Sequence, residues 1–479
     1  MNNNSRFFFV LLSVGAAIGL GNIWLFPYFS YKLSGLFFIP YIIALFLLGV
    51  PLLILEFSIG QYFNKDIVDL FASVKKRLSS IGWLMLFNAF IVMSYYAVVL
   101  SWHIIYFFVS FGLQWRNDAG EYFFSNVLQS EFFKGFTKFS LPAFIALILA
   151  WIVIFFYIRK GHESMKKGFL ITFPFFMLLI FLFLAYSLSL DNALAGIYAF
   201  LKPNIKGLLK LETWIEAFSL AAVSIGLSFG IMHALGRKAG KGFAVGNSFI
   251  VAVFELVSGI IIGFAVFSIL GFLAMKNGAG LSNVVFSDFG SEFTVLAQAF
   301  PFFYKPTLLS MLFFVFIGIF FVFGTASLAY SITYLLVNKF RTKHFNAAVF
   351  VSGLGFLLGL LFIISPGFYI MGIVNHFIYY NVIIGILLEV IAIGWFFDSW
   401  KIAHFISQNS SIKIGASWRI FIRYFAPLIL LLLLFLRIKS DLLTYNNYPF
   451  AYVMIFGIGI VVFPIVIAFL MPQKIFDRQ

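Results

Sequence analysis

Two clusters of small and polar residues interrupt long apolar stretches of this sequence. The first runs from Gly15 to Asn22 and the second from Ser224 to Gly230, and both are rich in glycine. Glycine tolerates backbone conformations that end a helix, and an interrupted helix leaves carbonyl and amide groups without helical partners. Such carbonyls can bind a cation, and the amides at a half-helix N-terminus can bind an anion. The alternative is that the small residues serve close helix packing.

A carboxylate inside an apolar segment is the second feature that suggests chemistry. Glu255 stands among apolar residues, where a charge is costly and usually functional. A protonated, hydrogen-bonded structural role is the alternative for Glu255. The other buried-looking polar residues are expected to bond neighbouring helices or to snorkel. They are Glu56, His103, His233, Glu389 and Arg423.

The composition determines the class of protein that must position these groups. The chain of 479 residues is 63% hydrophobic and 10% charged, with a mean hydropathy of +1.05. A soluble protein cannot bury so much apolar surface, so cytosolic enzymes and nucleic-acid-binding proteins are excluded as main interpretations. No cysteine is present, which excludes disulfides, thiol catalysis and cysteine-ligated metal sites. The six histidines show no metal-binding spacing.

Twelve apolar segments are long enough to cross a membrane as helices. Placing the N-terminus inside assigns twenty Lys and Arg residues to inner connecting segments and eleven to outer ones. The net charge of +15 therefore reflects the orientation of the chain in the membrane rather than a binding site for an acidic ligand. We expect both termini in the cytoplasm and the protein in the plasma membrane, the inner membrane of a prokaryotic cell. The segments are Phe7–Tyr31, Leu36–Tyr62, Trp83–Phe111, Leu141–Tyr157, Phe169–Leu188, Trp214–Leu235, Phe243–Met275, Leu308–Val337, Ala347–Ile364, Tyr369–Phe397, Phe421–Leu436 and Pro449–Met471.

The two clusters lie in the first and sixth of these segments. Interrupted helices that come first in each of two five-helix halves are typical of an inverted repeat. The sequence therefore predicts an all-α polytopic membrane protein with broken first and sixth helices. We expect a first repeat at residues 1–190, a second inverted repeat at 191–400 and two trailing helices at 401–479.

Sequence motifs along nearly the whole chain add a family resemblance. The stretch Gly19–Tyr28 reads GLGNIWLFPY, and it is followed by Ile39–Tyr41, Gly49–Leu52 and Glu56–Tyr62. This opening resembles that of the neurotransmitter:sodium symporter family, especially its prokaryotic amino-acid transporters. The resemblance implies sodium-driven secondary transport of an amino acid or a similar carboxylate-bearing compound. Sodium would be transported with the substrate rather than serve as a catalytic cofactor. Further matches include Tyr95-Tyr96, Trp102, Phe173-Pro174, Trp214, Phe264–Gly271, Glu389, Trp395 and Arg423-Tyr424.

Two sodium sites follow from matching the family's positions. The resemblance implies a first site formed by Ala17, Asn22, Ser224 and Glu255, of which Glu255 departs from the usual Asn. The implied second site combines carbonyls of the first helix with ligands from the eighth segment. Its residues are Gly15, Ile18, Phe323, Ala326 and Ser327, or Thr325 with Val322 if the register shifts by one residue.

The substrate site is also implied by the resemblance. Gly19 matches the position at which amine carriers hold an Asp, so a substrate with its own carboxylate is expected. Tyr96 and the amides of Leu20 and Gly21 would bind that carboxylate. Side-chain selectivity would come from Val92, Val223, Gly226, Phe229 and Ser327.

Two departures from the family modify these expectations. Gly259 lacks the hydroxyl that would help to bind chloride, and Glu255 can supply the negative charge instead, so we expect chloride-independent transport. Leu25 and Val374 replace the charged pair of the family's outer gate, which predicts an apolar gate closed by Tyr96 and Phe229. The loss of both partners avoids an unpaired charge. A substrate sensor that does not transport is the alternative function. A membrane enzyme would need a cluster of titratable residues at one membrane face, and this sequence shows none apart from the charges of the loops.

Overall fold

The computed structural model describes residues 3–19, 25–33, 37–115, 118–130, 138–202, 205–239, 242–278, 290–410, 412–444 and 448–471. In these ranges the chain is helical, apart from turns and an isolated bridge between Phe139 and Ile364. The all-α prediction is therefore confirmed.

Ten helices of the described residues are long and apolar enough to cross a membrane. Several contain a π-helical turn or a 3-10 end, so one span can comprise two labelled helices. The spans contain α3 (Phe38–Ala44) with α4 (Val50–Phe63), α6 (Ser79–Val109), α8 (Leu141–Ile158), α9 (His162–Leu188), α14 (Ala244–Lys276), α16 (Pro306–Phe340), α17 (His344–Gly359), α18 (Gly367–Ile391), α20 (Ala416–Ile420) with α21 (Ala426–Thr444), and α22 (Phe450–Tyr452) with α23 (Gly459–Leu470). Twelve crossings were expected from the sequence, and that number remains a prediction.

The two expected spans that are missing from these ten are the ones that contain the glycine-rich clusters. In the first, α1 (Asn3–Ile18) and α2 (Leu25–Lys32) are separate short helices, and residues 20–24 lie outside the described part. In the sixth, six residues separate the end of α12 (Leu211–Ser224) from the start of α13 (Ile231–Lys238). The φ angles of Gly226, Ser228 and Gly230 are 76°, 63° and 74°. These left-handed conformations cannot continue a right-handed helix, and the two glycines adopt them without steric cost.

Shorter helices connect the long ones. They are α5 (Ile67–Val74), α7 (Ala119–Tyr122), α10 (Ala193–Leu201), α11 (Ile205–Leu208), α15 (Ser291–Thr294) and α19 (Ser399–Asn409). Asp66 begins α5 as its N-cap, and its side chain accepts a hydrogen bond from the amide of Asp69. Asp118 caps α7 in the same way through the amide of Glu121.

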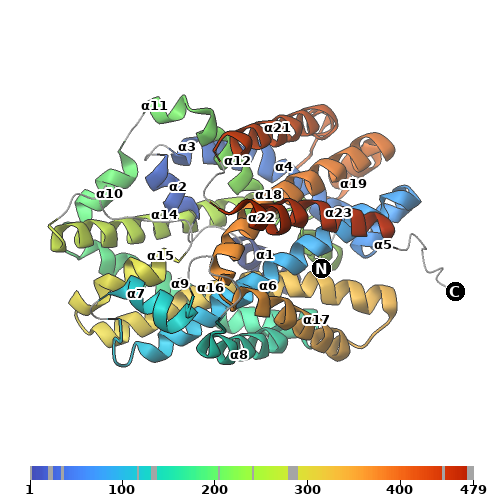
Figure 1. Ribbon diagram of the computed structural model, residues 1–479. Helices are drawn as coiled ribbons and strands as arrows, with labels where there is room; N and C mark the ends of the chain where they lie inside the picture. Colours follow the sequence, from blue (N-terminus) through green and yellow to red (C-terminus); the bar gives the residue numbers. More distant parts are fainter. Residues whose placement is uncertain are drawn as a thin grey trace.

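The broken helices pack against several of the long ones. α6 packs against α16, and α1 contacts α9, α14 and α16. Figure 1 shows α8 and α17 side by side along one margin and α21 at the opposite margin, with α1 between them. In the most apolar 18-residue stretch of the span that contains α6, 89% of the residues are buried, against 17% in that of the span that comprises α22 and α23. α6 is thus a central helix, whereas α23 presents its apolar side chains outward, as expected for contact with lipid.

Candidate ion and substrate site

Tyr41 connects two of the residues expected at the first sodium site. Its hydroxyl lies 3.0 Å from the hydroxyl of Ser224 and donates a hydrogen bond to the carboxylate of Glu255. The three residues come from α3, the last position of α12 and the middle of α14, and all are buried. The structure therefore brings Ser224 and Glu255 together. Sequence analysis gave Tyr41 no role, although it stands in the Ile39–Tyr41 motif.

The remaining expected ligands of this site belong to the first segment. Ala17 is fully buried in the last turn of α1, where the final carbonyl groups of a helix lack intrahelical partners. α1 packs directly against α14, the helix that carries Glu255. Asn22 lies outside the described residues. The described part of the site therefore contains one carboxylate, two hydroxyls and the end of a helix, which are hard oxygen ligands of the kind that sodium binds.

The backbones of α1 and α16 meet beside Tyr96. A side-chain carbon added to Gly19 would lie 2.2 Å from the amide nitrogen of Gly324. A carbon added to Gly324 would lie 3.2 Å from Cδ2 of Tyr96. Because no side chain fits at either glycine, Gly19, Gly324 and Tyr96 form a close junction of three helices. Leu20 and Gly21, which were expected to bind the substrate carboxylate with Tyr96, lie outside the described residues.

The second expected sodium site lies along the same pair of helices. A carbon added to Gly15 would lie 2.3 Å from the Phe169 ring, and that ring stacks on Phe323 at 4.6 Å between centroids. The Phe169 ring thus contacts both α1, at Gly15, and α16, at Phe323, the two helices that were expected to supply carbonyl ligands. The carbonyl of Gly15 also accepts a hydrogen bond from the amide of Gly19 at 3.0 Å. Ile18 and Ala326 are fully buried.

Two hydroxyls of α16 are suitable ligands for this site. Thr325 and Ser327 are fully buried, and neither hydroxyl has a hydrogen-bond partner within the described part of the chain. A buried hydroxyl without a partner costs free energy, and a bound cation would remove that cost. Because both alternatives for the register of α16 supply such a hydroxyl, the choice between Ser327 and Thr325 stays open.

The other residues expected around the substrate occupy the surfaces next to this junction. Val92 lies one helical turn before Tyr96 on α6, and both residues are buried. Val223 is the penultimate residue of α12, and Gly226 and Phe229 follow in the interrupted segment. The assignment of these residues to a substrate pocket remains a prediction.

A buried cluster of two carboxylates and an imidazole holds the interrupted segment in place. Glu56 of α4 accepts a hydrogen bond of 2.8 Å from the amide of Ser228. His233 of α13 lies with Nδ1 3.3 Å from Glu56 Oε2 and with Nε2 2.9 Å from Oε1 of Glu389 on α18. The expectation that Glu56, His233 and Glu389 bond neighbouring helices is confirmed.

The potential ligand atoms of these three side chains lie within 4.8 Å of one another, which is close enough for them to surround a metal ion. However, the imidazole of His233 faces a different carboxylate with each nitrogen. One metal ion binds a single imidazole nitrogen, so this arrangement suits a bridging imidazole better than a metal centre. We therefore assign the cluster to the support of α13.

The two positions that match the family's gate pair lie on α2 and α18, and an apolar gate there remains a prediction. Leu25 is half-buried at the start of α2, and Val374 is buried on α18. The neighbouring Asn375 accepts a hydrogen bond of 3.0 Å from the hydroxyl of Tyr95. Charged residues on α2, α12, α18 and α21 interact nearby, and sequence analysis did not single them out.

Comparison with known proteins identifies the family. The model of the sodium:neurotransmitter symporter family matches residues 2–118 and 114–477. An uncharacterised sodium-dependent transporter of Methanocaldococcus jannaschii is 30% identical over 98% of this chain and 97% of its own length. A sodium-dependent nutrient amino acid transporter of Drosophila virilis is 26% identical over 89% of this chain and 75% of its own. The sodium- and chloride-dependent taurine transporter of Rattus norvegicus is 29% identical over 78% of this chain and 67% of its own.

The matched residues include both interrupted segments and all ten long helices, so the likeness extends over the whole architecture. The chain therefore belongs to the sodium:neurotransmitter symporter family, and it is a sodium-coupled, multi-pass membrane transporter rather than an enzyme.

Proposed function

We propose that this protein is a sodium symporter of an amino acid or a similar small carboxylate-bearing substrate. The observation that carries the proposal is the contact of Gly19 with Gly324 beside Tyr96, because it leaves no room for a side chain at position 19. An acidic side chain that would pair with a substrate ammonium is thus excluded from this position. A substrate that brings its own carboxylate fits better, and its carboxylate would bind the Tyr96 hydroxyl and the first sodium ion.

Chloride-independent transport is the second part of the proposal, and it rests on Glu255. A buried sodium ion needs a nearby negative charge, because an uncompensated ion in a medium of low polarity is strongly destabilised. Glu255 is buried beside Ser224 through Tyr41 and can provide this charge. Gly259, one helical turn further on α14, has no hydroxyl for an anion.

The mechanism would be alternating access. Sodium bound between α1, α12 and α14 orders the ends of the broken helices, and substrate binds beside it at the junction with α6 and α16. Each ligand shifts the equilibrium between outward-open and inward-open states only by its difference in affinity for them. The five-plus-five repeat at residues 1–190 and 191–400, with trailing helices at 401–479, would supply the two moving units.

The proposed setting is the plasma membrane, the inner membrane of a prokaryotic cell, with both termini in the cytoplasm. The excess of Lys and Arg in alternate connecting segments supports this orientation. In this orientation α1 and α13 are the inner halves of the broken helices, and α2 and α12 are the outer halves.

Uptake into proteoliposomes tests the proposal. A radiolabelled amino-acid mixture would be supplied with an inward sodium gradient or with a matched potassium gradient. We expect accumulation only with sodium, and we expect it to persist when gluconate replaces chloride. Loss of uptake without chloride would overturn the role given to Glu255. Sodium-dependent binding without accumulation would identify a sensor, and the absence of both binding and uptake would contradict the substrate class.

A further inference from the structure

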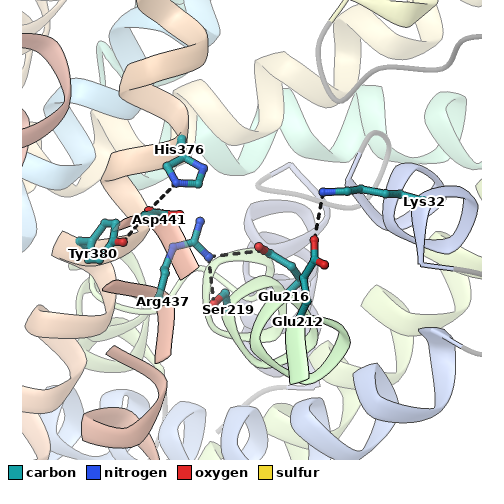
Figure 2. A network of polar contacts seen from close by, with 8 residues as sticks. All are labelled: Lys32, Glu212, Glu216, Ser219, His376, Tyr380, Arg437 and Asp441. Carbon is teal, nitrogen blue, oxygen red and sulfur yellow. Dashed lines mark hydrogen bonds and ion pairs between the residues drawn. The ribbon is translucent and has the colours of Figure 1, made fainter. Parts of the chain in front are cut away.

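Charged side chains connect the two proposed outer half-helices to α18 and α21, as Figure 2 shows. Lys32 Nζ of α2 lies 3.1 Å from Oε1 of Glu212 on α12. One turn further along α12, Glu216 accepts a hydrogen bond of 3.4 Å from Arg437 of α21. The same nitrogen of Arg437 donates to the hydroxyl of Ser219 at 3.3 Å. Arg437 therefore ties α12 to α21.

The opposite end of this network ties α21 to α18. The carboxylate of Asp441 lies one helical turn beyond Arg437. It accepts a hydrogen bond from the hydroxyl of Tyr380, and its Oδ2 lies 2.7 Å from Nε2 of His376. The guanidinium of Arg437 also lies over the Tyr379 ring, 4.8 Å from its centroid. α21 and α18 are thus joined by several polar contacts, whereas the contact of α21 with α12 is centred on Arg437.

The two ion pairs in this network differ in how far their side chains are exposed to solvent. The side chains of Lys32 and Glu212 are 47% and 46% exposed, so water screens their attraction and the pair contributes little to stability. The side chains of Arg437 and Glu216 are 4% and 19% exposed. Removal of one partner of such a pair leaves the other charge poorly solvated, which makes this the energetically important contact.

We propose that Arg437 is the latch of the outer gate, which closes when its guanidinium binds Glu216 and Ser219 of α12. The proposal rests on the proposed transport function and orientation. The positions of the family's gate pair are apolar here, and Lys32 lies seven residues, about two helical turns, beyond Leu25 on α2. The proposed charged closure therefore lies outward of the family's gate positions and between a different pair of helices, α12 and α21, while the exposed pair of Lys32 with Glu212 bridges α2 and α12.

The physical chemistry of the pair suits a reversible latch. When α12 separates from α21, water enters and hydrates both charges, and this offsets much of the attraction that is lost. The net free-energy difference between the open and closed states is then small enough for sodium and substrate to shift it. An apolar contact would lack this compensation, because opening would expose its surface to water.

A cysteine reporter tests the latch without any need for transport. The chain contains no cysteine, so a single Val374→Cys substitution provides one reactive thiol at a buried position of α18. A membrane-impermeant methanethiosulfonate reagent would be added to the outer face. In the additional variants Glu216→Gln and Glu216→Gln/Ser219→Ala we expect labelling to become about tenfold faster, which corresponds to about 1.4 kcal/mol.

Glu163→Gln is the matched control, because Glu163 forms an exposed pair of 3.1 Å with Lys167 away from this network. This control should leave the labelling rate unchanged. Labelling of folded Glu216→Gln/Ser219→Ala protein at the parent rate would overturn the proposal. Because labelling needs no substrate, a failure of the latch can be distinguished from a failure of the proposed symport, which the sodium-driven uptake assay reports.

A reversible crosslink provides the second test. In a Glu216→Cys/Arg437→Cys variant, a short bis-methanethiosulfonate reagent would hold α12 against α21. We expect crosslinking to abolish the uptake that the double variant shows before the reagent is added, and dithiothreitol to restore it, whereas the reagent should not change the uptake of either single-cysteine variant relative to the same variant without reagent. Full transport by the crosslinked protein would show that α12 and α21 need not separate, and this would overturn the latch.

Discussion

A side-chain carbon on Gly324 would lie 2.1 Å from the carbonyl oxygen of Gly19. The contact joins Gly19, which directly follows α1, to the middle of α16. The atom that this added carbon would meet belongs to the backbone, so it cannot rotate away as a side-chain atom could. The separation of α1 from α16 at this point is therefore set by the absence of a Cβ on either residue.

Gly324→Ala is predicted to abolish or severely reduce sodium-dependent uptake. The added methyl group must push α1 away from α16, and such overpacking typically costs about 1–3 kcal/mol. Uptake and thermal stability in detergent would be measured together. Gly353→Ala on α17 is the control, because a carbon there meets no atom within 4 Å. A fully active Gly324→Ala protein would contradict the close junction.

Tyr41→Phe is predicted to weaken the apparent sodium affinity by about tenfold or more while the protein remains folded. The change removes only the hydroxyl that joins Ser224 to Glu255, and a hydrogen bond to a charged group contributes about 1.5–3 kcal/mol at most sites. The sodium concentration for half-maximal uptake is the measurement. Tyr157→Phe removes a hydroxyl bonded to Thr172 between α8 and α9 and should leave this concentration unchanged.

His233→Leu is predicted to destabilise the protein strongly. The change leaves Glu56 and Glu389 as buried carboxylates without the imidazole between them, and breaking a buried ionic contact costs about 3–5 kcal/mol. The temperature at which the monodisperse peak is lost in size-exclusion chromatography would report the change. Glu163→Gln, which breaks an exposed pair, should shift this temperature little. Equal stability of the two variants would show that the buried cluster does not support α13.

Asp66→Asn is predicted to reduce the pH dependence of stability. Burial raises the pKa of Asp66 from 3.8 to about 6 in the folded protein, and the amide of Asp69 partly opposes this shift. The folded state therefore binds the proton more tightly than the unfolded state does. The resulting stabilisation is complete below the unfolded pKa and is lost as the pH rises through about 6.

Between pH 5 and pH 7.5, wild-type protein should thus lose about 1 kcal/mol of stability that Asp66→Asn does not lose. Asn is also a good N-cap, so the start of α5 should stay intact. Melting temperatures at the two pH values provide the comparison. Asp118→Asn is the control, since Asp118 caps α7 through an equivalent hydrogen bond in an exposed position. Parallel pH profiles for wild type and Asp66→Asn would rule out this role.

Interrupted helices could be predicted from the sequence because glycine content and hydropathy are local properties. The end of α1 at Ile18 and the gap between Ser224 and Ile231 follow from the clusters that begin at Gly15 and Ser224. The long apolar segments likewise predicted the ten long helices, since a run of apolar residues must form a helix in lipid. The resemblance added the pairing of Ser224 with Glu255, which composition alone does not predict.

Contacts between helices could not be predicted from the sequence, because they require a particular rotation of each helix about its axis and a particular depth of each helix in the bundle. Tyr41, Ser224 and Glu255 lie far apart along the chain, and nothing in their local sequence indicates that they share hydrogen bonds. The same holds for the position of His233 between Glu56 and Glu389. Apolar helices have similar surfaces on most sides, so hydropathy alone does not determine which polar residues meet. The sequence by itself therefore determined where the helices break, and only packing decided which side chains meet at the breaks.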